Sequence, residues 1–192
     1  MLSNIRPAIV MIALFTLLTG LIYPMAVTGI AQALFRGKAD GGIIRDASGQ
    51  VVGAQLIGQG FAKPQYLHPR PSAAGTGYDA SNSAGTNMGP LNSKLADRMA
   101  TDAAAIRKDA PGGVIPADAV TTSGSGLDPD ISPAYAHLQA SRIAAVRHAP
   151  AADVDQMITA TTGGAFLGFI GQPHVNVLEL NRALDARFPV KK

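Results

Sequence analysis

One charge-free stretch decides the architecture of this 192-residue chain. Residues 7–35 read PAIVMIALFTLLTGLIYPMAVTGIAQALF, and no Asp, Glu, Lys or Arg lies between Arg6 and Arg36. A bilayer core of ~30 Å needs about 20 helical residues, so this stretch is long enough to cross a membrane. We therefore predict a transmembrane helix over residues 7–35, preceded by a short cytoplasmic N-terminus at residues 1–6.

Two prolines and a cleavage-like triplet bear on this helix. Pro7 suits a first helical position because its missing N–H costs nothing there, whereas Pro24 should kink the helix or mark the membrane interface. The alternative is a cleaved signal peptide, with Ala31-Gln32-Ala33 as its cleavage site. Signal peptides have apolar regions of only about 7–15 residues. The longer apolar stretch therefore favours an uncleaved anchor.

Small residues recur four positions apart within the predicted span. Thr16 is followed by Gly20, and Gly29 is followed by Ala33. This spacing places each pair on one helix face and lets a second helix approach closely. We expect these four residues to pack against a helix of a partner.

Residues 36–192 are predicted to form a single loop-rich soluble domain of mixed α+β type. The chain has 21 Gly and 13 Pro, which is typical of a backbone with many turns. The absence of Cys excludes disulfides, thiolate metal sites and cysteine nucleophiles. The net charge of +3 is spread along the chain, whereas nucleic-acid binders concentrate positive charge on one face or arm. We expect no nucleic-acid partner.

Apolar periodicity and turn residues predict the elements of this domain. Ser132 followed by Pro133 is typical of a helix start, and Tyr135, Leu138, Arg142 and Val146 should lie along that helix. The other expected elements are a hairpin over residues 43–57 with its turn at 46–49, helices over 91–106, 152–162 and 178–187, and a short strand over 174–177.

A long polar loop is predicted over residues 61–90. Half of its residues are Gly, Pro, Ser, Thr or Asn, and it has no periodicity. Loops of this length inside a compact domain are uncommon and are either functional or disordered. The aromatic residues Phe61, Tyr66 and Tyr78 favour an ordered loop pinned to a surface.

Few residues point to a reaction centre. No two of the four His are three or four positions apart, so we interpret them as solvated or hydrogen-bonded and predict no metal site. The segment SGSGLDP at residues 123–129 favours a tight turn over a nucleotide loop. A Ser/His/Asp site built from distant segments stays open, which leaves a membrane-anchored envelope hydrolase or a scaffold protein as alternative functions.

Several blocks resemble the C subunit of the Kdp potassium-transporting P-type ATPase. They read LIGQGF at 56–61, YLHPRPSA at 66–73, TSGSGLDPDISP at 122–133 and GQPHVNVLELN at 171–181, and shorter matches precede them at residues 6–8 and 19–24. The blocks occur in order along essentially the whole chain. The family commonly has Ser-Gly-Gly-Ser-Asn in the loop, where this chain has SAGTN at residues 83–87.

The resemblance implies an accessory, non-catalytic subunit of a high-affinity potassium uptake complex in the bacterial inner membrane. Its implied partners are a potassium-binding channel-like subunit, an ATP-hydrolysing P-type subunit, a small single-helix subunit and the lipid bilayer. The family is described as a catalytic chaperone that raises the ATP affinity of the ATP-hydrolysing subunit. No cofactor is expected to bind tightly, although ATP is a candidate shared with that subunit.

The resemblance also singles out two sets of residues. The first set is linked to nucleotide, with the alternative that Gln139 and Arg142 only tie their helix to its own domain. The second set belongs to a loop that docks on the potassium-binding subunit. They are Gln139, Arg142, Ser125 and Gly126 for nucleotide, and Phe61, Tyr66, Arg70, Ser72 and Asn87 for docking.

The orientation in the membrane has two conflicting indications. Arg36, Lys38 and Arg45 outnumber Arg6 near the helix, and the positive-inside rule then favours a cytoplasmic domain. The resemblance implies a single-pass protein with a periplasmic C-terminal domain. We follow the resemblance because the charge asymmetry amounts to only one or two residues.

Overall fold

The computed structural model describes residues 4–46 and 48–190. Part of the predicted N-terminal segment (residues 1–3), one residue of the predicted hairpin turn (Ala47) and the last two lysines lie outside the described residues. The chain divides into two compact units, Met1–Val52 and Gly53–Lys192.

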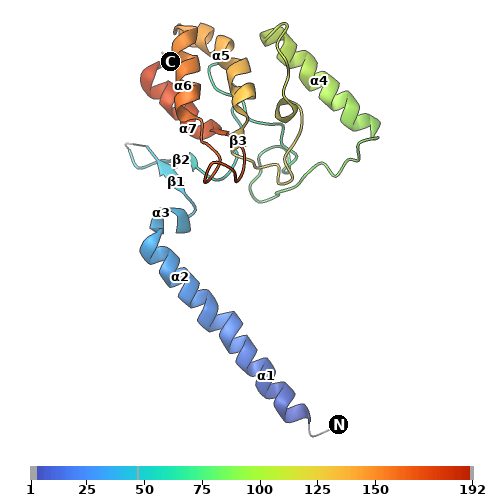
Figure 1. Cartoon of the computed structure of the whole chain (residues 1–192), viewed down its shortest axis with the longest axis vertical. Coiled ribbons are helices and arrows are strands. Elements are labelled where there is room, and N and C mark those ends of the chain that lie inside the picture. The colour runs from blue at the N-terminus through green and yellow to red at the C-terminus, as the bar shows by residue number, and fades with distance from the viewer. Residues whose placement is uncertain (1–3, 47, 191–192) are drawn as a thin grey trace. The chain divides into compact units, whose positions relative to one another are not determined.

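The first unit contains a continuous apolar helix over Ile5–Leu34, with a mean hydropathy of 2.1 and no buried residues in its apolar window. It consists of α1 (Ile5–Leu17), the π-helical segment η2 (Leu18–Ile22) and α2 (Tyr23–Leu34), which follow one another in Figure 1. The helix begins two residues before Pro7. The predicted start at Pro7 was therefore two residues too late. Pro7 is tolerated in the first turn because the N–H groups of that turn lack helical partners in any case.

Pro24 does not end this helix. It lacks the N–H that would pair with the carbonyl four residues back. The N–H of Tyr23 instead donates to the carbonyl of Leu18, five residues back. One π-helical turn absorbs the mismatch, so the span continues to Leu34.

A short helix and a hairpin follow the span. They are α3 (Arg36–Ala39), β1 (Ile43–Arg45) and β2 (Val51–Ala54), and β1 pairs with β2. The carboxylate of Asp46 accepts hydrogen bonds from the N–H groups of Ser48 and Gln50, at 2.9 and 3.0 Å. The second strand ends at Ala54, three residues before the predicted end.

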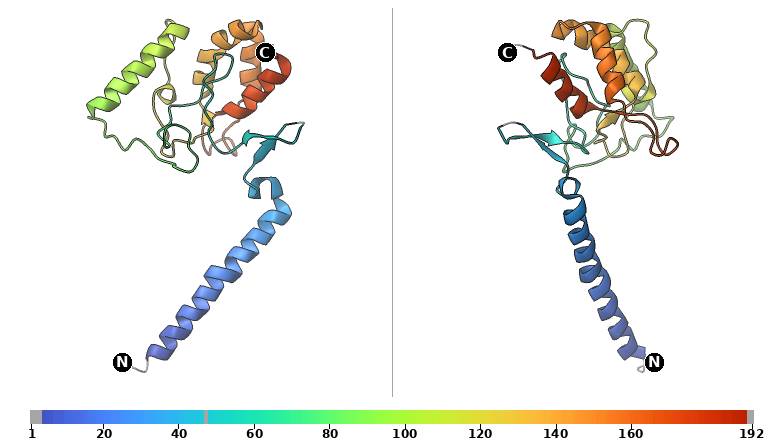
Figure 2. Two further views of the ribbon diagram at one scale, coloured as in Figure 1. Left: turned by 180° about the vertical axis from the view of Figure 1, so that it is seen from behind. Right: turned by 60° about the vertical axis from the view of Figure 1, so that its left-hand side comes forward.

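The second unit is mixed α+β, as predicted, and four helices dominate it (Figure 2). A second pair of strands is antiparallel, with Asp130 opposite Asn176 and Ile131 opposite Val175. The elements are α4 (Ser93–Asp109), η3 (Ala117–Ala119), β3 (Asp130–Ile131), α5 (Pro133–Arg147), α6 (Ala151–Thr161), β4 (Val175–Asn176) and α7 (Val177–Arg187).

Side-chain caps set three of these helix starts. Asn92, Ser132 and Asn176 each accept a hydrogen bond from a backbone N–H in the first turn. The Ser132 cap confirms the predicted start of α5. The predicted start of α4 at Leu91 was wrong by two residues, because the cap is Asn92 and Leu91 lies outside the helix, 99% exposed.

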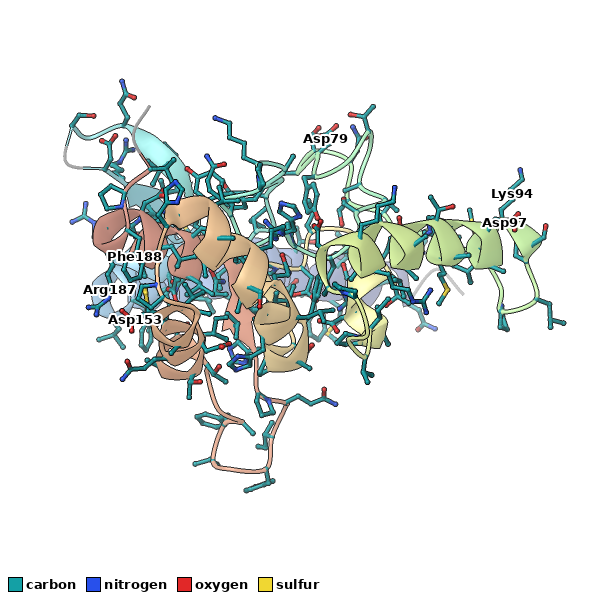
Figure 3. The ribbon with its side chains drawn as sticks, turned by 90° about the horizontal axis from the view of Figure 1, so that it is seen from above. Asp79, Lys94, Asp97, Asp153, Arg187 and Phe188 are labelled. Atoms are coloured by element: carbon teal, nitrogen blue, oxygen red, sulfur yellow. The ribbon has the colours of Figure 1, made fainter. Side chains whose placement is uncertain are left out.

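The core lies where α5, α6 and α7 pack together. Of the residues predicted along α5, Tyr135 is buried, and Leu138, Arg142 and Val146 are partly buried. The buried face also carries Gln139, Ile143, Arg147 and three alanines. At one edge of this packing, Arg187 lies 4.0 Å from Asp153 and its guanidinium stands over the Phe188 ring (Figure 3). The fully buried residues of this core are Leu67, Ala136, Ile143, Val154, Ile158, Val175, Leu180 and Leu184.

Candidate functional site

Two amide side chains hold the long loop (residues 61–90) through its backbone. Asn181 on α7 accepts a hydrogen bond from the N–H of Leu67 at 2.7 Å and donates to the carbonyl of Leu67 at 3.0 Å. Gln139 on α5 makes the same pair of bonds with His68, at 2.8 and 3.0 Å. Each amide thus imitates a neighbouring strand in a sheet ladder. Both are buried, with 1% of Asn181 and 7% of Gln139 exposed.

Two arginines on α5 bind the preceding loop residues. Arg142 donates to the carbonyls of Pro64 and Tyr66 and, at 2.7 Å, to the side-chain oxygen of Gln139. Arg147 donates to the carbonyl of Gln65 at 2.8 Å and stands over the Tyr66 ring, 5.3 Å from its centroid. We call the four side chains the clamp: Gln139, Arg142, Arg147 and Asn181.

Burial lowers the pKa of two basic side chains at the clamp. Desolvation, helped by the nearby Arg142 charge, lowers the pKa of His68, which favours its neutral form. Desolvation also lowers the pKa of Arg142, and the carboxylate of Asp109, 3.4 Å away, opposes that shift. Gln139, Arg142 and His68 border a cavity of only about 30 Å³. That volume suits a single water molecule.

The next part of the loop is tied to the turn at residues 123–128. Arg70 donates to the carboxylate of Asp128 at 2.9 Å. The hydroxyl of Ser72 donates to the carbonyl of Gly126 at 2.7 Å and accepts from the N–H of Tyr78 at 2.9 Å. The hydroxyl of Tyr78 donates to the carbonyl of Arg70. Segments about 50 residues apart in sequence therefore form one polar unit.

Position 126 of this turn has no room for a side chain and favours glycine. Its φ is +68°, and a Cβ atom there would lie 2.6 Å from the carbonyl oxygen of Ala84. The neighbouring Ser125 accepts the N–H of Ala84 at 2.9 Å through its carbonyl, and its hydroxyl accepts the N–H of Leu127 at 3.1 Å. The segment 123–129 is a tight turn, as the sequence favoured.

A groove of about 520 Å³ separates the loop from α4 and α5. Its volume is within the range of small-molecule sites. Burial raises the pKa of Tyr135 on its wall to about 12, so this hydroxyl stays protonated. The groove is lined, among others, by Phe61, His68, Arg70, Ser72, Tyr78, Asp102, Ile106 and Tyr135.

The structure places the residues predicted for nucleotide and docking, except Asn87, at the clamp, the turn or the groove. Gln139 and Arg142 belong to the clamp and contact the loop that contains Tyr66. Ser125 and Gly126 lie in the turn against Ala84. The groove collects Phe61, Arg70 and Ser72, whereas Asn87 is exposed with φ +52°. The nucleotide and docking roles of these residues stay predictions.

Sequence reasoning missed two members of the clamp, Arg147 and Asn181. A signal for Asn181 was present, because it lies three residues before Leu184 and one after Leu180, on a helix face that is otherwise apolar. The signal for Arg147 was its position four residues after Ile143. A polar residue inside an apolar stripe indicates a buried hydrogen-bonding role.

The small residues that are predicted to pack against a partner helix lie on the exposed surface of the apolar helix. Thr16, Gly20 and Gly29 are exposed, and Ala33 is exposed as well. A Cβ atom on Gly20 would lie 4.0 Å from Cγ2 of Thr16, so these two residues share a helix face. Packing against a partner helix stays a prediction.

Three histidine rings in the described part of the chain bond to a carboxylate or to backbone carbonyls. His137 lies 2.8 Å from the carboxylate of Asp155. Among residues 4–46 and 48–190, no serine hydroxyl bonds a histidine ring; the hydroxyl of Ser132 bonds Asp118 at 2.9 Å. No cluster of metal-ligating side chains is found in the same residues.

The chain thus combines one helix that is long and apolar enough to cross a membrane with a small α+β domain. The chain matches the family described as "KdpC: K+-transporting ATPase, c chain" over residues 5–186. It therefore belongs to the KdpC family.

Relatives in several bacteria match nearly the whole chain. A protein of Caulobacter vibrioides named "Potassium-transporting ATPase KdpC subunit" is 65% identical over 189 residues, which cover 98% of this chain and 96% of the relative. Proteins of the same name from Beijerinckia indica and Koribacter versatilis are 59% and 48% identical, over 100% and 99% of this chain and 98% of each relative. The similarity thus includes both the apolar helix and the domain.

Proposed function

We propose that this chain is a non-catalytic subunit of a high-affinity potassium-transporting ATPase, and that it stabilises the complex and raises the ATP affinity of the ATP-hydrolysing subunit. The observation that carries the proposal is the family match over residues 5–186, which covers both units. The proposed place is the bacterial inner membrane, with one span and a periplasmic domain. The proposed partners are the potassium-binding, ATP-hydrolysing and small single-helix subunits.

The clamp supports a specific way for the domain to act. Gln139 and Arg142 bond to the backbone of the long loop and to each other. In the proposal they are positioning residues, which hold the loop in the conformation that docks on the potassium-binding subunit. A loop that is already ordered loses less entropy when it docks.

The effect on ATP is then indirect. A periplasmic domain and a cytoplasmic nucleotide lie on opposite sides of the bilayer, so the influence has to pass through the membrane-embedded partners. Such coupling between sites is typically about 5–150-fold in affinity. The 30 Å³ cavity beside Gln139 and Arg142 agrees with this view, since it is far smaller than a nucleotide site.

Replacement of Gln139 by alanine in the reconstituted complex tests the proposal. We expect the ATP concentration for half-maximal activity to rise about fivefold or more, with the maximal rate unchanged, because a loss of binding alone acts in this way. Gln156→Ala is the matched control, since Gln156 is exposed on α6. A lower maximal rate at unchanged ATP dependence in the intact complex would contradict the proposal.

A further inference from the structure

The segment between α6 and β4 carries an exposed apolar tip. Four large apolar side chains at this tip are 51–77% exposed: Phe166, Leu167, Phe169 and Ile170. Figure 3 shows the segment projecting from the body of the domain at the lower edge of the view. Isolated exposed apolar residues are ordinary on protein surfaces, but a contiguous group of this kind marks an interaction site.

Four backbone N–H groups of the tip donate to carbonyls of the tip itself. Phe166 and Ile170 exchange two bonds, of 2.8 and 2.9 Å, and the N–H groups of Gly168 and Phe169 donate to the carbonyls of Ala165 and Phe166. Below the tip, Gly163 and His174 close the base with bonds of 2.8 and 3.0 Å. These bonds lower the cost of bringing the tip into the interfacial region of a bilayer, because an unpaired N–H or C=O costs several kcal/mol in an apolar environment.

The tip also holds an apolar side chain in an unfavourable backbone conformation. Leu167 has φ +54°, in the left-handed region that a branched residue rarely adopts. Glycine or asparagine would occupy this position with less strain. Strain of this kind is a reason to look for a function of the side chain, and here it presents leucine outward, 70% exposed.

The chemistry of the tip favours lipid over a protein partner. Residues 165–171 read AFLGFIG and contain no side-chain hydrogen-bond donor or acceptor, and no Asp, Glu, Lys or Arg occurs from residue 156 to 178. Protein interfaces carry about one hydrogen bond per 100–200 Å² to define their partner, whereas a bilayer requires only that apolar surface be buried and no charge be dehydrated.

The chain itself brings the bilayer within reach. Its apolar span ends at Leu34, and only residues 35–52 separate it from the second unit. A tether of this length keeps the domain at the membrane surface and gives the tip a high effective concentration of lipid. We propose that Phe166, Leu167, Phe169 and Ile170 insert into the interfacial region of the bilayer and form a second membrane contact of this chain.

Tryptophan fluorescence tests the proposal directly, because the chain contains no Trp. The full chain carrying Phe169→Trp is reconstituted into phosphatidylcholine vesicles, with and without lipid brominated near the top of the acyl chain. We expect a blue-shifted emission maximum and loss of most of the intensity in the brominated vesicles. Leu91→Trp is the control, since Leu91 is 99% exposed elsewhere in the same unit, and its emission should be unaffected.

A second variant tests whether the apolar character of the tip causes the insertion. Adding Leu167→Asp to Phe169→Trp should abolish both the shift and the quenching, because it brings a charge to the inserting tip. Equal intensity of Phe169→Trp in the two kinds of vesicle would overturn the proposal. Equal quenching of both tryptophan positions would also overturn it, and so would shielding of Phe169→Trp that occurs only with the other ATPase subunits, which would make the tip a protein interface.

Discussion

Replacing Asn181 by alanine should be among the most damaging single changes in the clamp. The Asn181 side chain is the partner of two groups, the N–H and the carbonyl of Leu67, at 2.7 and 3.0 Å. Leu67 has no exposed surface, so water cannot easily replace the lost bonds. A buried group left without a partner costs about 1–3 kcal/mol. The loss of both bonds should therefore lower the free energy of unfolding by roughly 3 kcal/mol.

Urea unfolding of the full chain in detergent, followed by circular dichroism, measures this change. Asn82→Ala is the matched control: Asn82 is exposed and its side chain bonds only its loop neighbours, so its effect should stay within about 0.5 kcal/mol. A loss below about 1 kcal/mol for Asn181→Ala would refute the reasoning, since it would mean that the Leu67 backbone finds other partners at little cost.

Three other changes give distinct outcomes. Gly126→Ala should lower the free energy of unfolding by about 2 kcal/mol or more, because φ at this position is +68° and the added Cβ would lie 2.6 Å from a carbonyl oxygen. Gly124→Ala is the control in the same urea titration and should have little effect, because its Cβ would have nothing within 4 Å. Burial holds the pKa of His68 below its ordinary 6.5, so the unfolded chain takes up the proton first. The free energy of unfolding should then fall as the pH drops below about 6.5, and His68→Gln should flatten that slope. Gly20→Leu should reduce recovery of partner subunits from detergent extracts, because a large side chain separates closely packed helices; unchanged recovery would remove the packing claim.

Local sequence patterns were sufficient where the physical cause is local. The long apolar helix over Ile5–Leu34 could be predicted because a charge-free run of more than about 20 residues has to be helical if it crosses a bilayer. The start of α5 could be predicted because Ser132 caps a helix that opens with Pro133. The turn at residues 123–129 followed from its glycines, of which Gly126 adopts positive φ. In each case the decisive interaction joins residues a few positions apart.

The candidate site could be predicted only in part. Gln139 and Arg142 were identified by resemblance, but nothing in the spacing showed that both would bond to the loop more than 70 residues earlier. The β2 strand was predicted too long for a similar reason. After Ala54 the backbone bonds to distant groups, since the carbonyl of Gln55 accepts from Asn176 and the N–H of Gly58 donates to Leu127.

Hydropathy, helix caps and turn residues act over one or two turns of backbone. The amino-acid pattern alone therefore predicted a helix long enough to cross a membrane, an α+β domain and a long polar loop. The identity of the side chains that hold that loop follows only from the packing of segments distant in sequence. Asn181 and Leu67 are 114 residues apart, and an amide commits to a partner only when packing has buried both and removed the competing water. Burial acts in the same way on Arg147, whose guanidinium donates a hydrogen bond to the loop instead of lying at the surface.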